Sequence, residues 1–429
     1  MKQNQPQSIP FTPYQKFVVA ILALLQFTVI LDFMILSPLG VFLMKSLEIS
    51  PTGFGIVVSS YAFSAGISGI FAAGFADKFD RKKLLLFFYA GFIIGTLFCA
   101  LATSFWMLLA ARIVTGLFGG VIGAISMAII TDIFPLNQRG KVMGFVQMGF
   151  AASQVLGIPL GLFFANRWGW HSAFIMIVTL ASLIAVLIYT RMKPVDQHLS
   201  LQSDKTAVKH LLHTFANKNY QIAFVATAFL SVGGFMLMPF GSAFTIHNLG
   251  IGQESLEWLF LVTGLASIVI MPLVGRLSDK FDKFKLFCIG SAIATVMVNV
   301  YCNLPPVALW QLMIVNVILF MGIMSRIVPA TTLTSAIPEM KDRGAFMSIN
   351  SSLQQMAGGI AAVVAGLIVS QDTPTSPLKN YNILGIVVSV VTIICAFLVY
   401  RVSEMVKRKI AQKKEVMAVE PLEAAFMAD

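Results

Sequence analysis

The chain has 429 residues, of which 57% are hydrophobic and only 11% are charged. Soluble domains carry about 25% charged residues, so this composition excludes an ordinary soluble protein and indicates one embedded in a lipid bilayer. The formal net charge of +11 would suit a nucleic-acid partner, but the basic residues are distributed as in membrane proteins, so we expect no nucleic acid.

Apolar runs of about 20 residues recur along almost the whole chain, and each is long enough as a helix to cross a hydrocarbon core about 30 Å thick. We expect twelve membrane-spanning helices. They are predicted at residues 17–44, 52–76, 83–103, 106–131, 141–165, 170–192, 220–247, 255–277, 284–304, 308–333, 344–370 and 381–403.

The basic residues predict how these helices are oriented. Roughly 25 of the 30 Lys and Arg residues fall in connections on the side that holds both termini, which places both termini in the cytoplasm. The first apolar run is longer than the apolar part of a signal peptide and lacks a cleavage site in its flank, so we expect it to remain as the first span.

Asp32, in the first predicted span, is the only one of the 19 acidic residues that lies deep in an apolar run. An ionised Asp at mid-bilayer costs about 2.5–3.5 kcal/mol, so an acid at this depth indicates a function such as proton exchange. That function requires Asp32 to face the space between the helices and not to be packed away from it.

Arg112, in the fourth predicted span, is the natural partner of Asp32. At 1.5 Å per residue, Asp32 lies about 22 Å from the face where its helix starts, and Arg112 lies about 9 Å from the opposite face. In a core of about 30 Å the two side chains reach nearly the same depth. A pair could take part in proton coupling, or it could be a permanent ion pair that holds the N-terminal part together.

Glycines four residues apart mark the fourth and fifth predicted spans. Gly116 and Gly120 form one such pair, and Gly157 and Gly161 form another. Each pair lies on one face of its helix and lets a neighbouring helix approach closely. Pro159 gives the fifth span a point at which it can bend, because proline lacks a backbone donor.

A charged connector occurs twice. The segments "GFADKFDRKK" from Gly74 and "GRLSDKFDKFK" from Gly275 share Asp-Lys-Phe-Asp, and the second copy of this tetrapeptide comes 202 positions after the first. A polar stretch at 193–219 divides the spans six and six. We therefore expect two homologous six-helix halves. The predicted divisions are an N-terminal bundle at 1–192, a cytoplasmic linker at 193–219, a C-terminal bundle at 220–403 and a cytoplasmic tail at 404–429.

The first connector resembles the signature loop between helices 2 and 3 of the major facilitator superfamily, whose pattern is Gly-x-Leu-Ala-Asp-Arg-x-Gly-Arg-Lys. "LLAARIVTGLFGG" from Leu108 is similar to the helix 4 motif of proton-coupled members, and "VLGIPLG" from Val155 resembles the helix 5 motif of exporters. The second motif is typical of the twelve-span drug:proton antiporter branch that includes arabinose-efflux-type permeases. Asp80 and Asp282 replace the internal Gly of the signature loop, and Asp is among the few residues that tolerate positive φ.

The resemblance implies an all-α integral membrane fold with twelve transmembrane helices, in which two six-helix halves are related by a pseudo-twofold axis along the membrane normal. The halves would rock about a shared central cavity. Residues expected to contact the substrate in this cavity are Gln26, Gln147, Gln154, Arg326, Asn350 and Gln354. Arg326 has no acid nearby in its own half, so it either extends to the cytoplasmic mouth or binds an anionic group of the substrate.

The resemblance also assigns roles to the charged connectors. Asp77 and Asp279 stand at the aspartate of the signature loop, and Arg81 and Lys283 stand at its second basic position. These residues would latch the cytoplasmic side while it is closed, and Arg81 would pair with Asp132 at the end of helix 4. A solvated turn that only follows the charge rule is the alternative.

The function implied is proton-coupled export of small amphipathic molecules through a bacterial inner membrane, with Asp32 and Arg112 in proton coupling. The partners would be a small-molecule substrate, protons and the lipid bilayer, and the protein would be a monomer.

The four cysteines lie in apolar runs at no metal-ligand spacing, so no metal or cofactor is expected. Uptake by a symporter or uniporter of the same fold is the alternative. A membrane enzyme or receptor is less favoured, because the chain carries no nucleophile motif or nucleotide-binding loop.

Overall fold

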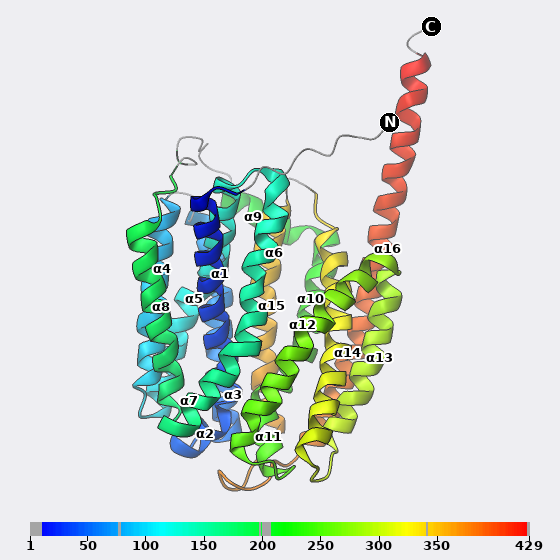
Figure 1. Cartoon of the computed structure of the whole chain (residues 1–429). Helices are drawn as coiled ribbons and strands as arrows, with labels where there is room; N and C mark the ends of the chain where they lie inside the picture. Colours follow the sequence, from blue (N-terminus) through cyan, green and yellow to red (C-terminus); the bar gives the residue numbers. More distant parts are fainter. Residues whose placement is uncertain (1–10, 76–78, 197–198, 200–206, 340–341, 427–429) are drawn as a thin grey trace.

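The structure is a computed structural model that describes residues 11–75, 79–196, 199, 207–339 and 342–426. Apart from one isolated β-bridge between Ser370 and Lys379, the regular structure of these residues is helical (Figure 1). Within them, twelve helical segments are long and apolar enough to cross a membrane. The predicted all-α fold with twelve transmembrane helices is therefore confirmed.

The first six spans, called the N-terminal half below, are built from nine helical elements in the described residues. They are α1 (Pro13–Ile35), α2 (Gly40–Ser46), α3 (Pro51–Phe75), α4 (Arg81–Ala100), α5 (Phe105–Ile133), α6 (Leu136–Ala152), the π-helix η2 (Ser153–Gly157), α7 (Ile158–Trp168) and α8 (His171–Arg191). The fifth span consists of α6, η2 and α7.

The last six spans form the C-terminal half, and the short helix α9 precedes them. In chain order these elements are α9 (Ala207–Ala216), α10 (Lys218–Phe235), the 3₁₀ helix η4 (Met238–Phe240), α11 (Gly241–His247), the 3₁₀ helix η5 (Gln253–Ser255), α12 (Leu256–Lys280), α13 (Lys283–Cys302), α14 (Leu309–Ser335), α15 (Arg343–Ile368) and α16 (Tyr381–Phe426).

The two charged connectors start their helices in the same way. The Asp80 side chain accepts hydrogen bonds from the backbone N–H of Lys82 at 2.7 Å and of Lys83 at 3.1 Å, and so caps α4. Asp282 accepts from the backbone N–H of Lys285 at 3.0 Å and caps α13. The φ angles of Asp80 and Asp282 are −53° and −58°, so the expected positive φ is wrong. The aspartate at this position of both connectors instead caps the N-terminus of the helix that follows.

The first span of each half is broken near a proline. The span predicted at 17–44 is interrupted after Ile35, and α2 begins at Gly40, two residues after Pro38. The seventh span is interrupted at η4, which contains Pro239. Proline removes a backbone donor, so a helix breaks readily there. The two breaks meet, because the Ser37 hydroxyl donates a hydrogen bond to the backbone carbonyl of Met238.

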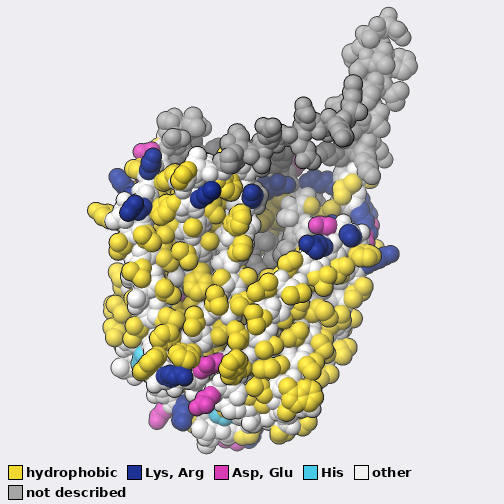
Figure 2. Space-filling model, viewed as in Figure 1, with side chains coloured by type: hydrophobic (Ala, Val, Ile, Leu, Met, Phe, Trp, Pro, Cys, Tyr) yellow, Lys and Arg dark blue, Asp and Glu magenta, His cyan; other side chains and the backbone are white. Residues whose placement is uncertain are grey.

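The halves contact each other along α3 and α15, at the centre of the bundle (Figure 1). The Thr52 hydroxyl donates to the Gly366 carbonyl at 2.7 Å, and the Asn166 amide donates to the Glu257 carboxylate at 2.7 Å. Both contacts lie at the end of the bundle away from the two termini. At the opposite end the space-filling surface is hollowed between the halves (Figure 2). The central space is thus closed at one end and hollowed near the end that carries the termini.

Candidate functional site

A cavity of about 650 Å³ lies between the two halves. Its walls are mostly apolar, with a few polar side chains distributed among aromatic and aliphatic ones, as in small-molecule binding sites. The residues predicted to contact the substrate that line it are Gln26, Gln147, Gln154, Arg326 and Gln354. These side chains come from α1, α6, η2, α14 and α15, so both halves contribute.

Asn350 is not among the residues that line the cavity, and its predicted place there needs correction. The next residue of α15, Ser351, lines the cavity together with Gln354 and Gln355. Successive residues of an α-helix point about 100° apart, so the side chain next to Ser351 turns away from the cavity. The Asn350 Oδ1 atom is buried and has no hydrogen-bond partner in the described structure.

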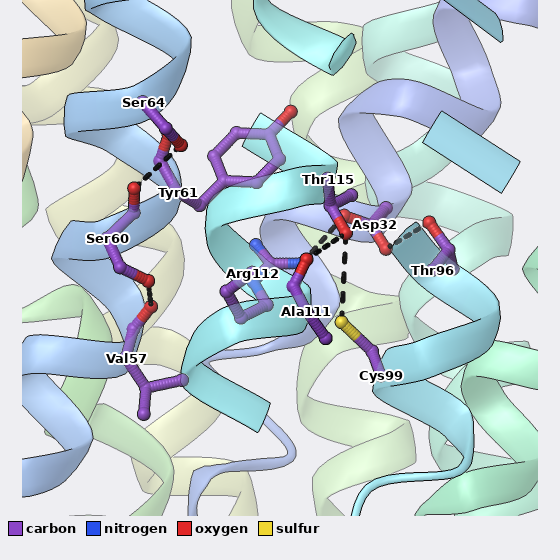
Figure 3. Close-up of polar contacts among 10 residues, drawn as sticks. All are labelled: Asp32, Val57, Ser60, Tyr61, Ser64, Thr96, Cys99, Ala111, Arg112 and Thr115. Carbon is purple, nitrogen blue, oxygen red and sulfur yellow. Dashed lines mark hydrogen bonds and ion pairs between the residues drawn. The ribbon is translucent and has the colours of Figure 1, made fainter. Parts of the chain in front are cut away.

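Asp32 and Arg112 form an ion pair inside the N-terminal half (Figure 3). The Arg112 Nη1 atom donates to Asp32 Oδ2 at 2.7 Å, and the Thr96 hydroxyl donates to Asp32 Oδ1 at 3.2 Å. Both charged side chains are completely buried. The pair joins α1 to α5, and Thr96 adds α4. The sequence predicted that Asp32 and Arg112 lie at nearly the same depth in the membrane, and the structure places the two side chains in contact.

Tyr61 separates this ion pair from the cavity. The Arg112 guanidinium lies 4.5 Å from the centroid of the Tyr61 ring. Tyr61 lines the cavity, whereas neither Asp32 nor Arg112 does. The expectation that Asp32 faces the central space is therefore wrong for this conformation. The physical reason is that two opposite charges in a medium of low dielectric constant turn toward each other and away from a mostly apolar wall.

Phe33, the residue after Asp32, links this region to the other half. Its ring centroid lies 5.3 Å from that of Tyr61 and 5.7 Å from that of Phe235. Phe235 ends α10, so the aromatic contact crosses between the halves. Tyr61 and Phe33 were not among the predicted site residues. A tyrosine within an apolar span was the available signal, because a buried hydroxyl in a membrane helix requires a partner or a polar surface.

Arg326 lines the cavity and is only 4% exposed. Its Nε and Nη2 atoms are buried and have no hydrogen-bond partner within the described residues. Among the described residues that line the cavity, Arg326 carries the one formal charge. Of the two places expected for this side chain, the structure has it at the cavity wall and not extended into the aqueous mouth.

The first connector contains the expected ion pair. Arg81 Nε lies 3.3 Å from Asp132 Oδ2, and the side chains are 7% and 19% exposed. The pair connects the start of α4 to the end of α5. Asp77, the aspartate of the signature loop, lies outside the described residues.

The second connector is arranged differently. Asp279 is exposed near the end of α12, and Lys283 begins α13. Neither residue makes an ion pair within the part of the chain that the structure describes. Asp282 instead lies 3.7 Å from Lys407 Nζ, and the backbone N–H of Lys285 together with Lys407 holds the pKa of Asp282 below its usual value. Both connectors thus form an ion pair with another helix, but with different residues: Arg81 pairs with Asp132 in the first half, and Asp282 pairs with Lys407 in the second.

The glycine pairs lie at close helix contacts. A Cβ atom on Gly116 would lie 2.5 Å from the Tyr61 carbonyl oxygen, and one on Gly120 would lie 2.4 Å from the Ala65 carbonyl oxygen. Helix α5 therefore packs directly on the backbone of α3. Gly157 and Gly161 face side chains of α1, with contacts of 2.7 Å from each added Cβ. Pro159 follows the π-helix η2, whose wider turn accommodates the missing donor.

Comparison with known proteins agrees with this architecture. The family model described as Major Facilitator Superfamily matches residues 22–240 and again 223–427. A "Probable sugar efflux transporter" of Helicobacter acinonychis (strain Sheeba) is 26% identical over 57% of this chain and 61% of that protein. "Uncharacterized MFS-type transporter YtbD" of Bacillus subtilis (strain 168) is 26% identical over 75% of this chain and 82% of that protein.

The fold also has a solved counterpart. The crystal structure of a bacterial homologue of the human lysosomal transporter Spinster, in an inward-facing and unoccupied conformation, superposes with a TM-score of 0.73 at 18% identity. The superposition covers 93% of this chain and 99% of that one. The repeated family match, the twelve spans and the cavity between two halves lead to one conclusion. The chain belongs to the Major Facilitator Superfamily and is a multi-pass membrane protein.

Proposed function

We propose that this protein exports small amphipathic molecules across a bacterial inner membrane in exchange for protons. The observation that carries the proposal is the central cavity, which is lined by both halves, mostly apolar, and hollowed near the end that carries the termini. With both termini in the cytoplasm, the hollowed end faces the cytoplasm and receives the substrate. Rocking of the two bundles, at 1–192 and 220–403, then exposes the cavity to the outside.

Export is proposed as the direction because the relatives named above include a probable sugar efflux transporter. The linker at 193–219 and the tail at 404–429 would then lie in the cytoplasm, and the working unit would be a monomer. The connector residues Asp77, Arg81, Asp132, Asp279 and Lys283 would latch the cytoplasmic side in the opposite conformation. In the inward-open state the contacts of the latch between the halves would be broken, and the Arg81–Asp132 pair, which lies within the N-terminal half, would remain.

Asp32 is the proposed proton carrier, which requires the outward-open state to expose to the central space the carboxyl group that Tyr61 covers here. In the outward-open state the Asp32 carboxylate would take a proton from external water, and the neutral acid would release Arg112. On return to the inward-open state the proton would leave to the cytoplasm as the pair forms again. Because Phe33 and Tyr61 contact each other and Phe33 contacts Phe235 of the other half, movement of the halves would displace the residues that cover the pair. A charge that crosses 100 mV supplies about 2.3 kcal/mol, enough for more than a tenfold gradient of a neutral substrate.

Everted membrane vesicles test this function, with the uncharged dye Nile red as the transported probe. An acidic vesicle lumen should drive dye accumulation, and an ionophore that collapses the pH gradient should stop it. Asp32→Asn should abolish the accumulation that depends on the gradient. Asp372→Asn is the matched control, because Asp372 is 65% exposed and pairs with Lys379 at the surface, and it should behave as the wild type.

A double variant distinguishes proton transfer from a purely structural ion pair. Asp32→Asn combined with Arg112→Gln removes both charges, so no buried charge is left without a partner. If Asp32 carries protons, the double variant should fold and remain uncoupled. Dye accumulation that still follows the pH gradient in this variant would show that the pair only stabilises the half. Counterflow of glucose without Nile red transport would indicate uptake instead of export.

A further inference from the structure

The positive charge of Arg326 remains uncompensated within the described structure. Its guanidinium reaches toward Gly233 of α10, where a Cβ atom would lie 3.6 Å from Nη2. The Cys395 thiol interacts with Arg326, but this thiol donates its own hydrogen bond to the Ala226 carbonyl at 3.9 Å and is a weak acceptor. The donors Nε and Nη2 are therefore available to another group.

Burial makes this arrangement costly for the empty protein. A guanidinium that is 4% exposed has lost most of its hydration, and it has no carboxylate among the described residues of the cavity wall. A bound anion would restore both the charge balance and the missing hydrogen bonds. The planar guanidinium suits a carboxylate in particular, since two N–H groups can donate to its two oxygens in parallel.

The rest of the wall determines the shape of such an anion. Phe150, Phe235, Phe260, Phe320 and Met34 are among the residues that line the same cavity. Aromatic and methionine side chains accept varied apolar groups. An apolar body attached to the anionic group therefore finds a favourable surface, whereas a small hydrated inorganic anion would leave most of the apolar wall uncovered.

The charge also excludes one class of ligand from favourable binding. A cationic amphiphile in this cavity would be repelled by Arg326, and the described wall offers it no Asp or Glu. We infer that the transported substrate is an amphipathic organic anion, with its carboxylate or similar acid group on Arg326 and its apolar body against the aromatic wall. This inference rests on the proposed function, because it takes the central cavity as the substrate site.

Binding of three matched compounds tests the inference without any gradient. The compounds are 4-phenylbutyrate, 4-phenylbutanol and 4-phenylbutylamine, which share one apolar body and carry an anionic, a neutral and a cationic head group. Each is titrated against the purified full-length protein in detergent, and the shift of the thermal unfolding midpoint gives the apparent affinity. The anion should bind about 10- to 100-fold more tightly than the alcohol, and the amine should bind most weakly. Equal binding by all three would overturn the inference.

Variants then assign the preference to Arg326. Arg326→Gln should reduce binding of 4-phenylbutyrate to the level of the alcohol and leave binding of the alcohol unchanged, which also reports that the cavity is intact. Arg326→Lys should retain part of the preference, because it keeps the charge and loses the paired donors. Arg191→Gln, at an exposed position that ends α8, should bind all three compounds as the wild type does. If the anion preference survives Arg326→Gln, the assignment is wrong.

Inorganic anions form the last arm of the test. If chloride or inorganic phosphate stabilises the protein and none of the phenylbutyl compounds does, the proposed organic substrate is overturned.

Because all binding measurements are made at equilibrium in detergent, they are independent of proton coupling and of transport direction. Failure of gradient-driven export would therefore leave this test valid, and failure of this test would leave export of uncharged molecules possible. Should Arg326→Gln fail to fold, the comparison of the three compounds on the wild type decides.

Discussion

Arg112 and Arg326 lie in the fourth and the tenth span, which are equivalent members of the two halves, yet their surroundings differ. Arg112 is fully buried behind Tyr61 and pairs with Asp32 at 2.7 Å. Arg326 is also buried, but it lines the cavity and has no ion-pair partner within the described residues. One arginine has its counter-charge within the fold, whereas the other would, by the inference above, receive a counter-charge from the bound substrate.

The two arginines should therefore respond differently to the same substitution. Arg112→Gln leaves the Asp32 carboxylate buried and unpaired, so it should cost about 3–5 kcal/mol of unfolding free energy. Arg326→Gln removes an unpaired buried charge and should leave the unfolding free energy unchanged or raise it. Thermal unfolding of both variants in one detergent, without added ligand, measures this contrast. Equal destabilisation of the two variants would mean that Arg326 has a structural partner after all.

The connectors provide a second comparison, with a smaller expected effect. Arg81→Gln removes the partly buried pair with Asp132 and should cost about 1–3 kcal/mol, between the values for exposed and for fully buried pairs. Lys283→Gln is the matched control in the other half and should change the unfolding free energy by less than about 0.5 kcal/mol. The same unfolding assay applies. A large loss in Lys283→Gln would show that Lys283 also takes part in an ion pair.

The helix cap at Asp282 should produce the smallest effect, and one that depends on pH. Its pKa is lowered in the folded protein, so its charge stabilises the fold above the unfolded pKa of about 3.9. This contribution is lost as the pH falls through the folded pKa. Asp282→Asn keeps a capping side chain without the charge, so its unfolding midpoint should lie slightly below that of the wild type at pH 7.

As the pH falls below about 4, the two midpoints should converge, since the wild-type carboxyl also becomes neutral. Solvent screening keeps the difference at pH 7 small, because the Asp282 side chain is 37% exposed. A difference that grows toward low pH would contradict the lowered pKa. Melting curves recorded from pH 7 down to the acid limit of the detergent-solubilised protein provide the measurement.

Much of this architecture could be predicted from the sequence, because membrane helices obey simple length and charge rules. The depth of Asp32 and of Arg112 followed from the rise per residue, and the structure places the two in contact. The repeated connector indicated the duplication, and the family model matches the chain twice. These inferences succeed because they depend on position along a helix axis, which the residue number determines.

Rotation about the helix axis could not be predicted in the same way. Asn350 turns away from the cavity while Ser351 lines it, and a one-residue error in the facing direction is enough to exchange them. The direction of the Asp32 side chain was likewise not predictable from its residue number. It points to Arg112 inside the N-terminal half and does not line the cavity. A single sequence carries no information on which face of a uniformly apolar helix meets which neighbour.

The π-helix η2 has a mechanical consequence at the seam between the halves. A Cβ atom on Gly264 of α12 would lie 2.7 Å from the Cα atom of Val155 and 3.0 Å from the Gln154 carbonyl, so backbone lies directly against backbone there. A larger residue at position 264 would therefore force the fifth and eighth spans apart at this point. Together with the Asn166–Glu257 hydrogen bond, this close backbone contact would make the line between the fifth and eighth spans the axis about which the two bundles tilt.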